Sequence, residues 1–141
     1  MKTILFPGSF DPFTIGHENL IKRILPVFDR VVVAVGVNSD KQYMFSVKER
    51  MERISKFFSF EPKVKVICFS DMTVDCCHRE GASYILRGVR NSKDMEYEQV
   101  VAAVNHKLDN SIETILLFAD PDLVDVSSTL ERERLLHEKN S

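Results

Sequence analysis

Residues 4–17 read Ile4-Leu5-Phe6-Pro7-Gly8-Ser9-Phe10-Asp11-Pro12-Phe13-Thr14-Ile15-Gly16-His17. The stretch begins as a short apolar run, breaks at Pro7-Gly8, stays irregular through Asp11-Pro12 and becomes regular again around Thr14. Apolar runs that stop at Pro and Gly are typical of strands, and a Thr before a periodic segment is typical of a helix start. We therefore predict a strand over residues 3–6, then a loop, then a helix.

The predicted helix start has the features of a phosphate site. Thr14 can cap the helix and leave backbone N–H groups of the first turn free to face an anion, which the positive helix end attracts. Gly8 and Gly16 carry no Cβ and permit close approach of the backbone. His17 falls in the first turn, where its imidazole can donate to charge developing on phosphorus. The alternative is an ordinary capping or exposed histidine on a βα unit.

Length and composition indicate one globular domain. A chain of 141 residues is long enough for a single core. The net charge of −2 argues against a broad nucleic-acid interface. The longest nearly unbroken apolar run, residues 31–37, is too short to span a membrane, and Met1-Lys2 leads directly into a strand without a signal-peptide pattern. We expect neither nucleic acid nor membrane as a partner.

The three cysteines predict a reducing, cytoplasmic location. Cys68, Cys76 and Cys77 are odd in number and two are adjacent, which does not make a disulfide framework. Cys76-Cys77-His78 also lacks the C-x₂-C spacing that presents two thiolates to one zinc ion, so we predict no protein-held metal. We interpret these cysteines as structural or incidental.

Strand and helix patterns alternate along the whole chain. Further strands are predicted at residues 31–37, 64–69, 83–86 and 113–118. Helices are predicted at residues 18–28, from a capping box at Ser46 and Glu49 to 57 or 58, at 73–80 before Gly81, at 92–108, and from 127 or 128 onward. The pattern predicts an α/β fold: one doubly wound domain over residues 1–141, with a five-stranded parallel sheet, helices on both faces and a short, charged C-terminal helix from about 127.

Polar residues follow every predicted strand, and ligands of such sheets bind at the carboxyl ends of the strands. These residues are Ser9 and His17, Lys41, Thr73, Arg87 and Arg90, and Ser127-Ser128-Thr129. The five glycines build neither G-x-G-x-x-G nor G-x-x-x-x-G-K, and no G-x-S-x-G nucleophile is present. Direct displacement at phosphorus is the simpler chemistry.

Two further stretches carry anion-binding chemistry. In residues 86–98, Arg87 and Arg90 flank Gly88, which is expected to let a loop turn tightly, and arginine forks suit phosphate oxygens. Asp94, Glu96 and Glu98 follow, placed to orient the arginines or meet a ribose hydroxyl; the alternative is a solvated, charged helix start. In residues 126–132, adjacent hydroxyls can contact phosphate or serve only as a helix cap.

Together the three stretches resemble the motifs of one enzyme family. Residues 8–17 resemble the G-T-F-D-P-x-T-x-G-H motif of phosphopantetheine adenylyltransferases, a branch of the nucleotidyltransferases, with Ser9 in place of Thr. Residues 87–98 resemble the family's R-G-[LIV]-R-x₃-D-[FY]-E-Y-E block, with Met95 at the aromatic position. Residues 126–132 resemble I-S-S-[ST]-x-[VI]-[RK], with Glu131 at the apolar position.

The resemblance covers residues 3 to about 130 and implies a Rossmann-like fold and a specific reaction. That reaction is adenylyl transfer from ATP to 4′-phosphopantetheine, which gives 3′-dephospho-CoA and pyrophosphate in coenzyme A biosynthesis. Mg²⁺ is implied as a companion of ATP, CoA as a feedback inhibitor, and a homohexamer as the assembly.

The resemblance also implies roles at matching positions. Catalytic roles fall on His17, Lys41 and Arg90. Phosphopantetheine contacts fall on Ser9, Lys41, Thr73 and Arg87, although the family uses backbone at the position of Thr73. ATP contacts fall on Ser9, Phe10, His17, Gly88, Val89, Arg90, Glu98, Leu123, Val124, Asp125, Val126, Ser127, Ser128 and Thr129.

Two alternatives remain open from the sequence. A small cytidylyltransferase has similar length, but its motif normally carries H-x-G-H where this chain has Thr14-Ile15-Gly16-His17. A nucleotide-binding module with weakened catalysis is the second, given the altered C-terminus. Intact Ser9, His17, Lys41 and Arg90 argue against the second alternative.

Overall fold

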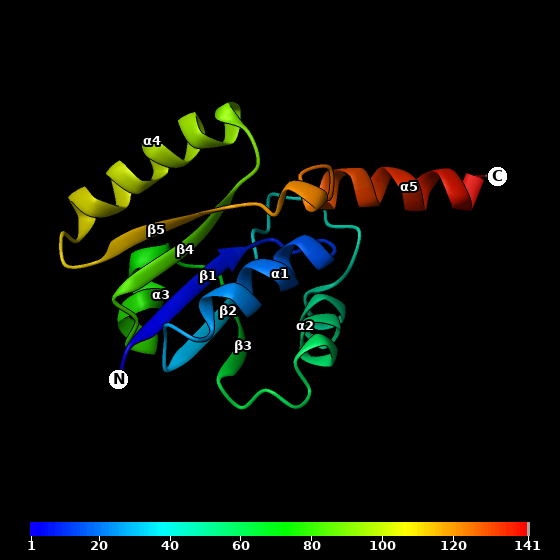
Figure 1. The fold of residues 1–141 in the computed structure, drawn as a ribbon. Helices are drawn as coiled ribbons and strands as arrows, with labels where there is room; N and C mark the ends of the chain where they lie inside the picture. The colour runs from blue at the N-terminus through cyan, green and yellow to red at the C-terminus, as the bar shows by residue number, and fades with distance from the viewer. Residues whose placement is uncertain (141) are drawn as a thin grey trace.

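The computed structural model describes residues 1–140 and is built around a parallel sheet with helices on both faces (Figure 1). The elements are β1 (Thr3–Gly8), α1 (Ile15–Ile24), β2 (Arg30–Gly36), α2 (Val47–Phe57), β3 (Val64–Phe69), α3 (Thr73–Glu80), β4 (Tyr84–Val89), α4 (Ser92–Leu108), β5 (Glu113–Phe118), the 3-10 helix η1 (Pro121–Leu123) and α5 (Ser128–Asn140). The strand order is β3-β2-β1-β4-β5 and every pair is parallel. The predicted doubly wound fold is confirmed, and the strand order changes direction beside β1.

β2 shows why the central strands read as unbroken apolar runs. Its side chains alternate between two cores: Val31, Val33 and Val35 pack with α1 and α2, whereas Val32 and Ala34 pack with α3. All five are fully buried. Each buried valine contributes about 1.5–3 kcal/mol of hydrophobic free energy, so covering both faces of the sheet fixes β2 at its centre.

Three predicted helix caps are confirmed. Thr14 is the N-cap of α1, and its hydroxyl oxygen faces the amide of His17 at 3.5 Å. Ser46 and Glu49 form the reciprocal capping box of α2, with both hydrogen bonds at 3.1 Å. Gly81 ends α3 in the left-handed conformation, φ 67°, which a residue without Cβ adopts freely.

The ends of two strands differ from the prediction. β1 continues through Pro7 and Gly8 because both residues pair with β2, and β4 continues through Arg87 to Val89 because these residues pair with β5. Gly88 therefore lies inside a strand and does not form the tight turn expected of it. The first helix is shifted toward the N-terminus, since α1 begins at Ile15 and ends at Ile24 whereas residues 18–28 were predicted.

Gly88 is needed for packing. A Cβ at this position would lie 2.5 Å from Cδ1 of Leu20 on α1, closer than any ordinary van der Waals contact. The missing side chain lets α1 approach β4. A side chain at position 88 would therefore displace Leu20, on a helix that also carries His17.

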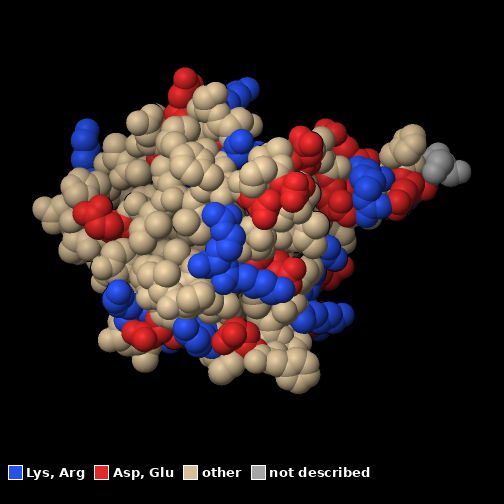
Figure 2. Space-filling model, viewed as in Figure 1, with Lys and Arg blue, Asp and Glu red and all other residues tan. Residues whose placement is uncertain are grey.

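α5 projects away from the sheet (Figure 1), and side chains of both charges cover it (Figure 2). Its first turn is attached to the loop after β1: the Ser128 hydroxyl donates to the Pro12 carbonyl and Arg132 donates to the Asp11 carbonyl, both at 2.7 Å. The predicted C-terminal helix begins at Ser128 and runs to Asn140; Ser141 lies outside the described residues. None of the helices in residues 1–140 is long and apolar enough to cross a bilayer.

Candidate active site

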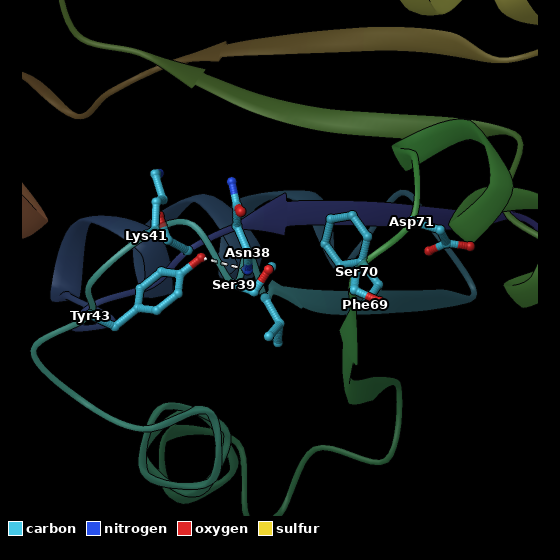
Figure 3. A pocket seen from close by; sticks show the side chains of 10 residues that line it. Asn38, Ser39, Lys41, Tyr43, Phe69, Ser70 and Asp71 are labelled. Carbon is cyan, nitrogen blue, oxygen red and sulfur yellow. Dashed lines mark hydrogen bonds between the residues drawn. The ribbon is translucent and has the colours of Figure 1, made fainter.

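Two cavities open at the carboxyl edge of the sheet, and Ser9 lines both of them. The lysine cavity, about 550 Å³, is lined by Ser9, Gly36, Val37, Asn38, Ser39, Lys41, Tyr43, Phe69, Ser70 and Asp71. The histidine cavity, about 430 Å³, lies between β1, β4 and the start of α5. Figure 3 shows the lysine cavity, with Lys41 and Tyr43 toward one end and Asp71 toward the other.

The histidine cavity gathers most of the predicted nucleotide contacts. Its wall includes Ser9, Phe10, His17, Arg87, Gly88, Val89, Arg90, Glu98, Leu123, Val126, Ser127, Ser128 and Thr129. Ser127 also caps α5, because its hydroxyl oxygen accepts from the amide of Leu130 at 3.1 Å. The fold therefore brings residues from three separate stretches, 9–17, 87–98 and 123–129, to one place.

Other predicted site residues lie elsewhere. Arg87, which we expected beside Lys41, lines the histidine cavity and not the lysine cavity. Thr73 is the first residue of α3 and, like Val124 and Asp125, is not among the residues that line either cavity in the described part of the chain.

The hydrogen bonds of His17 define which of its ring nitrogens can serve a ligand. His17 is the third residue of α1, and its Nδ1 accepts from the backbone N–H of Thr14 at 3.0 Å. An amide N–H only donates, so Nδ1 is the acceptor and the proton of the neutral ring is on Nε2. Phe13 stacks on the ring with centroids 5.2 Å apart, and Phe10 meets it edge-on at 5.0 Å.

The imidazole of His17 is uncharged at neutral pH. Burial, which is the largest cause, and the positive charges of Arg87 and Arg90 together lower its pKa from 6.5 to about 4. A neutral ring with its proton on Nε2 is a hydrogen-bond donor that carries no charge of its own. Such a group can stabilise negative charge that develops on a nearby oxygen.

Acidic residues of α4 orient both arginines. Arg87 forms a two-pronged ion pair with Glu98, with both distances 2.8 Å, and also donates to the Pro7 carbonyl at 2.8 Å. Glu98 is buried. Arg90 donates to Asp94 through Nε at 3.1 Å and through its backbone N–H at 3.0 Å. The predicted orienting role of Asp94 and Glu98 is consistent with these contacts.

Lys41 lies on the irregular segment between β2 and α2. Its side chain is exposed, and its backbone N–H donates to the Asn38 carbonyl at 3.0 Å. The Tyr43 hydroxyl accepts from the Asn38 N–H at 3.0 Å, the dashed line in Figure 3. A turn at residues 38–41 therefore carries the cation of the lysine cavity.

Sequence reasoning missed two residues that build this region, Asp11 and Arg50. The Asp11 carboxylate accepts from the backbone N–H groups of Met44 and Phe45 at 2.8 and 2.9 Å. Arg50 donates to three backbone carbonyls. One sequence signal was present: Arg50 falls on the apolar face of α2, in register with the buried Ile54 four residues on.

The cysteines take no part in this site. Cys76 and Cys77 are buried and Cys68 is exposed, and all three are free thiols. Burial raises the pKa of Cys76 to about 11 and that of Cys77 to about 12, so neither is a thiolate near neutral pH. Within residues 1–140 no three His, Cys, Asp or Glu side chains are grouped closely enough to hold a metal ion.

A doubly wound parallel sheet, with a Thr-x-Gly-His helix start and paired arginines at its carboxyl edge, defines an enzyme of the nucleotidyltransferase class. Residues 5–134 match the family model described as cytidylyltransferase-like. The chain is 46% identical to a phosphopantetheine adenylyltransferase of Flavobacterium johnsoniae, over 97% of this chain and 90% of that protein. It is 45% identical to one of Bacteroides fragilis, over 99% of this chain and 93% of that protein. The chain belongs to the phosphopantetheine adenylyltransferase family.

Solved structures agree on the fold. A putative nicotinate-nucleotide adenylyltransferase from Vibrio parahaemolyticus matches with a TM-score of 0.67 at 18% identity, over 98% of this chain and 89% of that chain. At this identity the likeness supports the fold alone.

Proposed function

We propose that this protein transfers the adenylyl group of ATP to 4′-phosphopantetheine, giving 3′-dephospho-CoA and pyrophosphate. The observation that carries the proposal is the pair of cavities that meet at Ser9. A reaction between two phosphorylated substrates needs two adjoining sites with one common border. The names of the relatives support the identity of both substrates.

The lysine cavity is proposed to hold phosphopantetheine, with its phosphate toward Lys41 and Ser9. The histidine cavity is proposed to hold ATP. Its contacts would be Ser9, Phe10, His17, Gly88, Val89, Arg90, Glu98 and residues 123–129, with Val124 and Asp125 acting at its margin. Arg87 lines the histidine cavity in the free protein, where it is paired with Glu98. We propose that the phosphate of phosphopantetheine competes with Glu98 for Arg87 when that substrate binds. We further propose that Thr73 contacts phosphopantetheine through its backbone.

The reaction then needs positioning and charge stabilisation. An oxygen of the acceptor phosphate attacks the α-phosphorus, the bond to the β-phosphate oxygen breaks, and pyrophosphate leaves with that electron pair. Nε2–H of His17 donates to an α-phosphate oxygen, where negative charge is stabilised during transfer. Lys41 and Arg90 neutralise the attacking and leaving groups. ATP is proposed to enter as its Mg²⁺ complex, with the ion held mainly by phosphate oxygens.

Product analysis tests this function. The protein is incubated with phosphopantetheine and Mg²⁺ and with either ATP or CTP, and pyrophosphate and the nucleotide product are measured. Adenylyl transfer predicts dephospho-CoA from ATP. Faster turnover of CTP would favour the cytidylyltransferase alternative, and nucleotide binding without pyrophosphate release would favour a binding module.

The protein is further proposed to act in the cytoplasm as a homohexamer inhibited by CoA. Self-association is supported by α4, on which Tyr97, Val100, Val104 and Leu108 are each at least half exposed. These residues recur at helical spacing and form one apolar stripe, and exposed stripes of this kind mark interfaces. CoA shares the phosphopantetheine arm and would compete for the lysine cavity. Neither nucleic acid nor membrane is among the proposed partners.

A further inference from the structure

Arg50 is a buried cation beside the active site. Its side chain is 2% exposed, and it lines neither the lysine cavity nor the histidine cavity. A buried guanidinium costs free energy unless its N–H groups are satisfied. Among residues 1–140 it forms no ion pair with a carboxylate, so its hydrogen bonds to the backbone are what hold it there.

Three backbone segments meet on this one side chain. Arg50 donates to the carbonyl of Ser9 at 2.7 Å, to that of Gly36 at 3.0 Å and to that of Phe45 at 3.2 Å. Its guanidinium also lies 3.9 Å from the ring centre of Tyr43. Ser9, Gly36 and Tyr43 all line the lysine cavity, so Arg50 fixes three parts of its wall from behind.

Asp11 holds the same segment through other backbone groups. Its carboxylate accepts from the N–H groups of Met44 and Phe45, while Arg50 donates to the Phe45 carbonyl. Between Ser9 and Asp11, Phe10 adopts a left-handed backbone conformation with φ 48°. Such a conformation is unfavourable for a bulky residue and persists where the surroundings hold it.

Lys41 depends on these anchors. The segment that carries it is fixed at Asn38, which the Tyr43 hydroxyl contacts, and at Met44 and Phe45, which Asp11 and Arg50 hold. We propose that Arg50 is a positioning residue that sets Lys41 and Ser9 for the acceptor phosphate. This inference rests on the adenylyl transfer proposed above.

The geometry requires arginine rather than a positive charge alone. A planar guanidinium presents several N–H groups in fixed directions and reaches three carbonyls at once, whereas a lysine ammonium is a single point on a flexible stem. Arg50→Lys keeps the charge and removes this fork. Arg50→Met removes both.

The test is steady-state kinetics of pyrophosphate release with each substrate varied. We expect Arg50→Lys to raise the KM for phosphopantetheine about tenfold or more, with the KM for ATP within about threefold of the wild type, because a small displacement near reacting groups is costly. Arg53→Met is the matched control. Arg53 lies one turn further on α2 and donates to one carbonyl, that of Phe13, at 2.8 Å, and we expect it to leave both KM values within about threefold.

A double variant separates positioning from general support. Since Arg50 is proposed to act through Lys41 and Ser9, Arg50→Lys should weaken phosphopantetheine binding by a clearly smaller factor when Lys41 is already alanine than in the wild type. Effects that multiply independently would overturn the proposal. An equal rise in the KM for phosphopantetheine in Arg53→Met would also overturn the proposal, because the effect would then belong to any side chain that attaches α2 to the backbone.

A further variant and a binding measurement test the role of Arg50 if its own variants do not fold or if the proposed reaction is not observed. If the Arg50 variants do not fold, Asp11→Asn weakens the opposite anchor and must itself raise the KM for phosphopantetheine selectively; no selective rise would overturn the inference. If the wild type makes no dephospho-CoA, the proposed function fails. Calorimetric titration of phosphopantetheine into the wild type and Arg50→Lys then decides the role of Arg50 separately, with equal affinities counting against it.

Discussion

His17 caps α1 through Nδ1 and presents Nε2–H for a ligand, and two substitutions separate these roles. His17→Ala removes both, and we expect kcat to fall by roughly 10²–10³-fold with ATP affinity nearly unchanged. The free energy of unfolding of His17→Ala should also fall by about 1 kcal/mol, because the capping hydrogen bond is removed. His17→Gln keeps a capping-box residue at the third helical position, so it should regain the stability but not the turnover. Near-normal turnover of the glutamine variant would remove the imidazole from the mechanism.

The lowered pKa of His17 predicts a pH-dependent stability. The pKa is about 4 in the folded protein and 6.5 in the reference state, so the unfolded chain binds this proton first as the pH falls. The contribution of neutral His17 is therefore complete above pH 6.5 and is lost as the pH falls toward 4. Denaturant titrations of the wild type and His17→Gln at several pH values measure the difference. A difference that stays constant from pH 7 to about 5 would contradict the shift.

Lys41 and Arg90 line different cavities and should affect different substrates. We expect Lys41→Ala to weaken phosphopantetheine binding about tenfold or more, since a charge-assisted hydrogen bond to phosphate contributes about 1.5–3 kcal/mol. Arg90→Ala should weaken ATP binding by a similar factor. Equilibrium titrations of each ligand with each variant check this, and the reverse pattern would exchange the two assignments.

At the scale of elements, the sequence predicted correctly the helix ends that depend on neighbouring residues. The caps at Thr14 and Ser46 and the stop at Gly81 depend on neighbouring residues, and all three were correct. The ends of β1 and β4 were wrong because pairing with β2 and β5 carries Pro7 and Gly88 into strands despite their weak strand preference. Arg50 and Asp11 escaped notice because most of their partners, such as Ser9 for Arg50 and Met44 for Asp11, are distant in sequence.

The contact between α1 and β4 gives a prediction about Gly88. Gly88→Ala places a methyl group where Cδ1 of Leu20 lies 2.5 Å away, so we expect a loss of about 1–3 kcal/mol in the free energy of unfolding. In a Leu20→Ala background the methyl group has room, and the loss should be small. Urea denaturation of the four members of this cycle measures the coupling, and independent losses would show that the overlap is relieved elsewhere.

At the scale of the whole molecule, the apolar stripe on α4 predicts an assembly. Val100 and Val104 are 65% and 52% exposed, so aspartate at both positions should leave the protomer fold intact. It should disrupt a self-association that buries the stripe. Light scattering after size-exclusion chromatography gives the mass of each form. A wild type that elutes as a monomer, or a double variant that assembles normally, would exclude this face as the interface.

Ser9 lines both cavities, and this has a consequence for how descendants of the enzyme can diverge. With the two substrates placed as proposed, a substitution at this shared border would alter the fit of both, so selection could not adjust one affinity there without disturbing the other. With the substrates placed as proposed, new substrate preferences would arise more readily at positions that line a single cavity, such as Asn38 in the lysine cavity and Leu123 in the histidine cavity. Position 9 is therefore expected to vary less than positions that line one cavity alone.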